Sequence, residues 1–227
     1  MLTRLLWLRF TPLLLIACLT SVALTCAQPS DDRDLRAFFS ASDDCRLDQS
    51  PPCWAGIRPG VTTLDDARTL LAAHPWVGAI TENNEPLAQY LYWEWNGRQP
   101  AYLNPADDKI PTFMWAQDDI IEFVTIPTQI SFGDLVLLYG EPEQGVLNVS
   151  RLGRQVLMSV RPNARLIAAY QSGQLLFDIT LRCPAPPINV WRAPVILGLY
   201  SSPSLLGVAL HPYDRAGWIY GRACVDT

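Results

Sequence analysis

Two short helices with matching start and stop signals constrain the fold of this chain more than any other feature. Thr63 opens one apolar-periodic stretch, which ends before Pro75, and Ser131 opens another, which ends before Pro142. In each stretch the hydroxyl can accept a hydrogen bond from a first-turn amide, and an aspartate three residues later lies near the positive end of the helix dipole. Proline then prevents each helix from continuing. The sequence therefore predicts two capped helices 68 residues apart, counted from Thr63 to Ser131.

Segments rich in aromatic and β-branched residues follow each helix and predict strands. They cover 87–95, 111–116 and 120–126 after the first helix, and 145–149, 155–160, 166–170 and 175–181 after the second. The last two segments of each set are separated by turn residues and predict a hairpin. We therefore predict an α+β fold with an internal duplication: two similar halves, each a short helix followed by an antiparallel β-meander.

This duplication sets the expected domain boundaries. We expect a leader, a tether, a first half, a second half and a C-terminal extension over residues 1–27, 28–51, 52–127, 128–183 and 184–227. The extension contains apolar runs at 195–200 and 205–210. These runs predict edge strands packed on the second half, and a short helix from Pro203 is the alternative.

The order of helix, Gly-x-Pro and strand meander resembles a known repeat. It is similar to the repeat shared by the β-lactamase inhibitor protein fold and the BamE (SmpA/OmlA) outer-membrane assembly lipoproteins. The opening Pro-Cys-Trp-Ala-Gly-Ile-Arg-Pro-Gly-Val-Thr-Thr over 52–63 also resembles the start of uncharacterised exported bacterial proteins with the same layout. The resemblance covers roughly residues 52–182. It implies a fold and a habit of binding proteins with the sheet face or loops, and it implies no catalytic residue.

The first 27 residues have the features of an export signal. Arg4 and Arg9 precede the uncharged apolar run 10–24, and small residues at 25–27 come before a polar stretch. This arrangement is typical of secretory signal peptides. We therefore expect an exported protein, either secreted or anchored on the outer side of the cytoplasmic membrane, that meets the membrane only through this segment.

Three fates fit this leader. Cleavage after Ala27 releases a soluble protein. Lipidation of Cys18 or Cys26 gives a lipoprotein, because Leu-Ile-Ala-Cys and Ala-Leu-Thr-Cys resemble a lipobox. An uncleaved anchor is the third fate, because 10–27 approaches the roughly 20 residues that span a bilayer.

Four cysteines follow the leader, and export favours their oxidation. The spacing of Cys45 and Cys53 matches no common zinc pattern. We predict the pairs Cys45–Cys53 and Cys183–Cys224, although four cysteines allow three pairings. A catalytic cysteine is the rival interpretation, and it is disfavoured because neither histidine is near a cysteine in sequence.

Charge and motifs argue against several classes of function. The 17 basic residues include two leader arginines, so the exported part, with 22 acidic residues, carries a net charge of −7. This charge argues against nucleic acid or an anionic membrane surface as a partner.

Standard catalytic and metal-binding patterns are absent: the chain has no Gly-x-Ser-x-Gly, Walker loop or His-Glu-x-x-His. His74 lies at a predicted helix end, where the dipole favours a cation. The acidic pairs lack the spacing of a calcium loop and are typical of solvated turns: Asp43-Asp44, Asp107-Asp108 and Asp118-Asp119. Glu94, Glu122 and Asp178 could supply a glycosidase pair, but acids on strands usually form the solvated face. We predict no catalytic residue, metal site or cofactor.

The strand over 90–95 is aromatic on both faces. Its period of two places Trp93 and Trp95, with Leu91, on one face and Tyr90 and Tyr92 on the other. One face must fill the core. The other either covers a neighbouring strand or forms a stacking platform for a sugar or for side chains of a partner. The candidate binding residues are therefore Tyr90, Tyr92, Trp93 and Trp95.

Two functions fit these observations. The favoured one is a non-enzymatic exported protein that binds another protein, because of the resemblance, the missing catalytic motifs and the disulfide-stapled scaffold. The alternative is a carbohydrate or cell-wall binding module that uses the aromatic strand.

Overall fold

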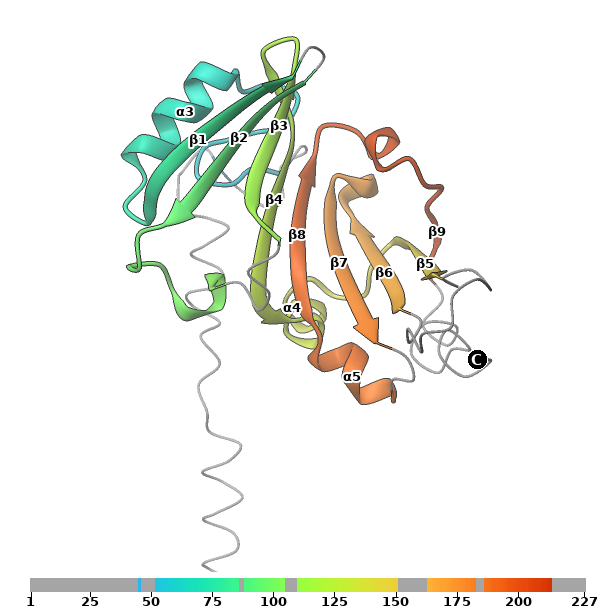
Figure 1. The fold of residues 1–227 in the computed structure, drawn as a ribbon. Coiled ribbons are helices and arrows are strands. Elements are labelled where there is room, and N and C mark those ends of the chain that lie inside the picture. The colour runs from blue at the N-terminus through green and yellow to red at the C-terminus, as the bar shows by residue number, and fades with distance from the viewer. Residues whose placement is uncertain are drawn as a thin grey trace, which may run out of the picture. The chain divides into compact units, whose positions relative to one another are not determined.

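The structure is a computed structural model that describes Cys45 and residues 52–85, 88–104, 110–150, 163–182 and 186–213 (Figure 1). These residues belong to one unit that spans Ala37–Thr227. The leader with Cys18 and Cys26, the expected pair Cys183–Cys224 and the predicted strand 155–160 lie outside the described residues.

Within the described ranges, all nine strands belong to one antiparallel sheet with the order β1-β2-β3-β4-β8-β7-β6-β5-β9. The strands are β1 (Val77–Glu85), β2 (Ala88–Trp95), β3 (Thr112–Gln117), β4 (Ile120–Ser131), β5 (Gln144–Ser150), β6 (Asn163–Tyr170), β7 (Leu175–Arg182), β8 (Pro194–Tyr200) and β9 (His211–Pro212). The helices are α3 (Leu64–Ala73), α4 (Phe132–Tyr139) and α5 (Pro187–Arg192), with 3₁₀ turns η1 (Ala101–Leu103), η2 (Gln171–Gly173) and η3 (Pro203–Leu206).

The predicted fold class of two helix-plus-meander halves is wrong. The described strands form one continuous sheet, and the protein is predominantly β. β4 and β8 lie side by side in the middle of this sheet and pair from Phe123–Tyr200 to Pro127–Ile196 (Figure 1). Backbone hydrogen bonds between β4 and β8 join the strands into one sheet, so no boundary separates two meanders.

β8 was expected as an edge strand of the C-terminal extension, and it is instead a central strand between β4 and β7. Its sequence Val195-Ile-Leu-Gly-Leu-Tyr200 carries apolar residues on both faces, as central strands do. Val195, Leu197 and Leu199 on one face are at most 2% exposed, and Ile196, Gly198 and Tyr200 on the other face are buried or partly buried. An apolar run on both faces therefore signalled a central strand.

Both predicted helices are confirmed, with their caps. The Thr63 hydroxyl oxygen accepts a hydrogen bond from the Asp66 amide at 3.2 Å, and the Ser131 hydroxyl oxygen accepts one from the Asp134 amide at 3.2 Å. α3 ends before Pro75, and α4 ends at Gly140, whose φ of 84° suits glycine. Caps and stop signals of this kind can be predicted from the sequence because they depend only on neighbouring residues and need no distant partner.

The two predicted hairpins, β3–β4 and β6–β7, are also confirmed. Asp118 and Asp119 connect β3 to β4 with φ of 50° and 66°, the backbone of a type I′ turn. β1 is not among the predicted strands, and its residues 81–85 are all exposed at the edge of the sheet. An exposed edge strand lacks the alternation of apolar residues that reveals a half-buried one.

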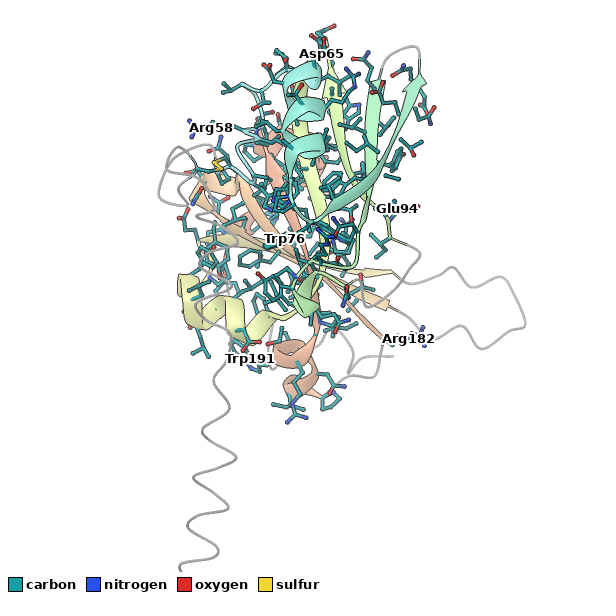
Figure 2. All side chains as sticks on the ribbon, turned by 90° about the vertical axis from the view of Figure 1, so that its left-hand side faces the viewer. Arg58, Asp65, Trp76, Glu94, Arg182 and Trp191 are labelled. Atoms are coloured by element: carbon teal, nitrogen blue, oxygen red, sulfur yellow. A yellow bond between two sulfur atoms is a disulfide. The ribbon has the colours of Figure 1, made fainter. Side chains whose placement is uncertain are left out.

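The main core lies between the sheet and the helices. Leu64, Ala67 and Leu71 of α3 are at most 4% exposed on this side. A row of five residues crosses β2, β3, β4, β8 and β7 in register, each at most 2% exposed: Leu91, Met114, Val124, Leu199 and Leu175. Full burial of one such side chain contributes about 1.5–3 kcal/mol. The packed side chains between α3 and the sheet are visible in Figure 2, with Asp65 at the start of the helix and Trp76 beyond its end.

Candidate functional site on the open face of the sheet

The sheet separates the four candidate binding residues of β2 into two pairs. Trp93 and Trp95 lie on the face that packs against the helices, and Trp93 is 4% exposed. Tyr90 and Tyr92 lie on the opposite face and are partly exposed. The four residues therefore cannot act as one platform.

The helix-facing pair belongs to an aromatic group that we call the enclosed cluster: Trp54, His74, Trp76, Trp93 and Trp95. Trp54 stacks on Trp93 with ring centroids 5.4 Å apart and meets Trp95 edge-on at 6.0 Å. His74 lies 5.5 Å from Trp54 and 5.2 Å from Trp76. These contacts assign Trp93 to the core and place the partly exposed Trp95 at its margin.

His74 is held in its neutral form within this cluster. Its Nδ1 accepts a hydrogen bond from the Trp76 amide at 3.3 Å. Burial lowers the pKa of His74 from its ordinary value, because a charged imidazole loses solvation there. Burial therefore opposes the charged form that the dipole at this helix end would favour.

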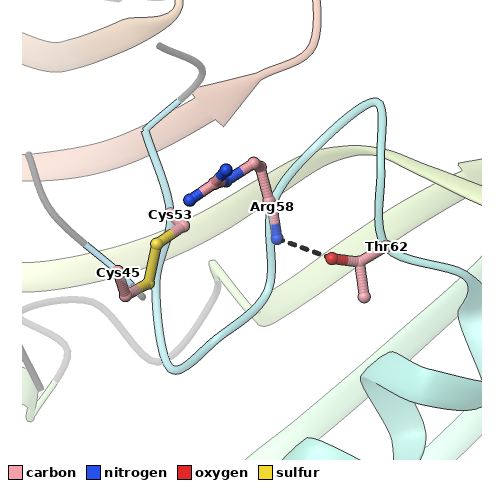
Figure 3. Close-up of a disulfide and its surroundings, with 4 residues drawn as sticks. All are labelled: Cys45, Cys53, Arg58 and Thr62. Carbon is pink, nitrogen blue, oxygen red and sulfur yellow. Dashed lines mark hydrogen bonds between the residues drawn. A yellow bond between two sulfur atoms is a disulfide. The ribbon is translucent and has the colours of Figure 1, made fainter. Parts of the chain in front are cut away.

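The residue before Trp54 is tied by a disulfide, which is drawn in Figure 3. Cys45 and Cys53 are bonded with their Cα atoms 5.4 Å apart, which confirms the first predicted pair. Both are at most 2% exposed. Beyond Trp54, the Arg58 amide donates a hydrogen bond to the Thr62 hydroxyl oxygen at 2.8 Å and closes the loop that leads into α3.

Six partly exposed aromatic side chains form a continuous line on the other face, which we call the aromatic row: Tyr90, Tyr92, Phe113, Trp115, Phe123 and Tyr200. Tyr92 stacks on both Tyr90 and Phe113, at 6.1 Å and 5.6 Å between centroids. Phe123 lies 5.5 Å from Phe113 and also 5.5 Å from Trp115. It stacks on Tyr200 at 5.3 Å, so the row crosses β2, β3, β4 and β8.

Gly198 leaves the space in which the Tyr200 ring lies, at the β8 end of the aromatic row. A Cβ atom at this position would lie 2.6 Å from Cε2 of Tyr200 and 3.5 Å from Cβ of Leu176. Only a residue without a side chain lets the Tyr200 ring lie back along β8 and meet Phe123. Burial raises the pKa of the Tyr200 hydroxyl, and the Asp178 carboxylate raises it further.

The same face is covered beyond Tyr200. Ile167, Ala169 and Leu176 are buried beneath partly buried residues of the segment 203–210, namely Leu206, Val208 and Leu210. At the boundary, Nε of Arg165 donates to both carboxylate oxygens of Asp178, at 3.0 Å and 2.9 Å. Phe113, Phe123, Tyr200 and this ion pair line a hollow of ≈ 260 Å³. That volume is below the roughly 300–1,000 Å³ of small-molecule pockets.

The other acidic candidates do not converge on a common site. Glu122 accepts a hydrogen bond from the Ser201 hydroxyl, and Asp178 pairs with Arg165. Glu94 is exposed, and Asp118-Asp119 forms the β3–β4 turn. In the part of the chain that the structure describes, no three His, Cys, Asp or Glu residues are grouped to hold a metal ion.

Four residues of the aromatic row are not among the predicted binding residues: Phe113, Trp115, Phe123 and Tyr200. Each sits in a predicted apolar segment, but the pairing Tyr92–Phe113 or Phe123–Tyr200 depends on strand order and register. The sequence signal that could have indicated this surface is the aromatic content of 113–123.

Comparison with known proteins gives no family for this chain: no family model, no curated protein and no solved structure matches it. Among the described helices, none has the length and apolar character needed to cross a bilayer.

Proposed function

We propose that this chain is an exported, non-enzymatic protein that binds another protein through the aromatic row. The observation that carries the proposal is six partly exposed aromatic rings in unbroken contact across four strands. α3 and α4 pack on the opposite face, where the enclosed cluster and the rings of Tyr139, Tyr170 and Phe177 lie. Tyrosine, tryptophan and phenylalanine are enriched at protein interfaces and dominate their binding energy.

The row is suited to binding because its side chains are already ordered. Each ring touches at least one other ring, and the strands beneath it are fixed by a continuous hydrogen-bonded sheet. Binding then costs little additional side-chain entropy, since about 0.5–1.5 kcal/mol is lost for each mobile side chain that must be immobilised.

The proposed export rests on the leader and agrees with the Cys45–Cys53 disulfide. Structural disulfides persist in oxidising compartments and are rare in the cytosol of most organisms.

A carbohydrate is the second candidate ligand, and one observation favours it. Tyr90, Tyr92 and Phe113 are partly exposed, and their ring centroids lie 5.6–6.3 Å apart with planes inclined by 22° to 45°. The exposed face of a ring in such a group can stack on a sugar ring.

The test is chemical crosslinking of the tagged full chain in the cells that produce it, followed by mass spectrometry. We expect one reproducible protein partner, and the double variant Tyr92→Ala/Phe113→Ala should reduce its capture at least about tenfold, as loss of hot-spot residues does. Thr69→Ala, at an exposed position on α3, is the matched control and should capture the partner normally. Undiminished capture by the double variant contradicts the proposal, and recovery of glycan without protein favours the second candidate.

A further inference from the structure

The aromatic row is framed by carboxylates. In the β1–β2 register, Thr81 lies opposite Tyr92, Asn83 opposite Tyr90 and Glu85 opposite Ala88. These residues therefore share one face, and Glu94, two positions after Tyr92, also belongs to it. Both Glu85 and Glu94 are exposed.

Unlike Glu82 and Asp178, these two carboxylates have no counter-charge among the described residues; Glu122, on β4, also lacks one and accepts a hydrogen bond from the Ser201 hydroxyl. Glu82 lies on the opposite face and pairs with Arg68, and Asp178 pairs with Arg165. The side chains of Glu85 and Glu94 make no hydrogen bond or ion pair with any residue in the described ranges. The four strands β1, β2, β3 and β4 contain no lysine, arginine or histidine.

The negative surface continues past the end of the row. A shallow hollow at this end of the sheet is lined by Glu85, Asp118 and Asp119, together with Gln89 and Gln117. This part of the face thus combines partly exposed aromatic rings with carboxylates, and none of the described residues on strands β1 to β4 or in this hollow is basic.

We propose that this part of the face binds a basic segment of the partner protein, with arginine side chains over the tyrosine rings and paired with Glu85 and Glu94. The inference rests on the proposed protein-binding function and specifies the chemistry of the partner. A guanidinium can stack on an aromatic ring and at the same time hydrogen-bond a carboxylate in a bidentate geometry. The net charge of −5 over the whole chain favours the approach of such a partner.

The direct test uses a hexa-arginine peptide and its hexa-citrulline counterpart, which has nearly the same shape without the charge. The full chain is titrated with each peptide by calorimetry, and NMR shifts of β2 and β3 amides locate the site. We expect the citrulline peptide to bind at least about tenfold more weakly, and the affinity for the arginine peptide to fall as salt is added.

Charge-neutral variants separate this site from general attraction to an acidic protein. Glu85→Gln/Glu94→Gln should raise the Kd for the arginine peptide at least about fivefold. The reason is that two exposed charge pairs are lost, and with them the carboxylates that hold the arginine side chains over the tyrosine rings. The matched single variants are Glu85→Gln and Glu82→Gln, which each remove one charge from β1 but on opposite faces, and Glu82→Gln should change the Kd less than about twofold. Equal effects of the two changes, or equal binding of the citrulline peptide, overturn the inference.

The cellular capture experiment distinguishes failure of this inference from failure of the proposed function. If Tyr92→Ala/Phe113→Ala abolishes capture and Glu85→Gln/Glu94→Gln leaves it unchanged, the face binds a protein through other chemistry and only this inference fails. If the aromatic variant has no effect, the proposed function fails. Recovery of a glycan alone overturns both.

Discussion

The two faces of β2 carry aromatic clusters of similar size that differ in what surrounds them. Trp93 and Trp95 are enclosed with Trp54 and His74 between the sheet, α3 and the disulfide-bonded segment. Tyr90 and Tyr92 begin a row of rings that touch one another and remain partly exposed. One strand thus supplies both a core and a candidate binding surface.

This difference separates aromatic residues kept for stability from those available for binding. Trp54 and Trp93 gain from nearly complete removal of apolar area from water, whereas rings in the row gain only part of that area. The chemistry of the residues agrees: the enclosed pair are indoles, and the exposed pair carry hydroxyl groups that can remain hydrated. Substitutions should therefore affect stability on one face and binding on the other.

The largest expected effect is that of Trp93→Ala. Removal of this buried ring should cost about 3–5 kcal/mol of unfolding free energy, measured by urea denaturation. Trp93→Phe keeps most of the packing, and the Trp93 indole N–H has no acceptor among the described residues, so this control should cost less than half as much. Near-native stability of Trp93→Ala would show that the cluster is not part of the core.

Loss of the disulfide comes next. Cys45→Ser/Cys53→Ser opens a loop whose ends are 8 residues apart and should cost roughly 2–3 kcal/mol in the chain-entropy description. Because Trp54 follows Cys53, the near-ultraviolet circular dichroism of the tryptophans should also weaken. An unchanged spectrum would separate the disulfide from the enclosed cluster.

On the open face, Gly198→Ala tests how the row is shaped. The new methyl group would meet the Tyr200 ring, and we expect a loss of about 1–3 kcal/mol in urea denaturation. In a Tyr200→Ala background the same change should cost less than about 0.5 kcal/mol, because the ring it meets is gone. Equal costs in the two backgrounds would contradict the contact.

Tyr92→Ala should have a small effect on folding and a large effect on binding. A partly exposed ring with two ring neighbours should cost less than about 1.5 kcal/mol of stability. Capture of the partner from cells should nevertheless fall strongly. A stability loss equal to that of Trp93→Ala would place Tyr92 in the core and remove the contrast between the faces.

The smallest expected effect is the pH response of His74. Its pKa is lowered by burial in the folded protein, so the unfolded chain binds the proton more readily. The stability that neutral His74 supports is therefore complete above about pH 6.5 and is lost as the pH falls through the lower folded pKa. Urea midpoints measured between about pH 7.5 and pH 5 should show this loss, and the His74→Gln variant should lack it.

Local parts of this fold could be predicted from the sequence, and long-range pairings could not. The caps at Thr63 and Ser131 and the turn at Asp118-Asp119 depend on neighbouring residues. The place of β8 in the middle of the sheet depends on a pairing with β4 about 70 residues earlier in the chain. The same limit applies to the candidate site: alternation along β2 separates Tyr92 from Trp93, but only register brings Tyr92 to Phe113 and Phe123 to Tyr200.

The central claim is that the open face, and not the helix-covered face, meets the partner. Site-specific photo-crosslinking in the producing cells tests it most directly, with benzoylphenylalanine placed at Tyr92, at Trp115 and at Thr69 on α3. We expect one protein adduct from Tyr92 and Trp115 and none from Thr69. An adduct from Thr69 alone, or none from either position of the aromatic row, would contradict the account.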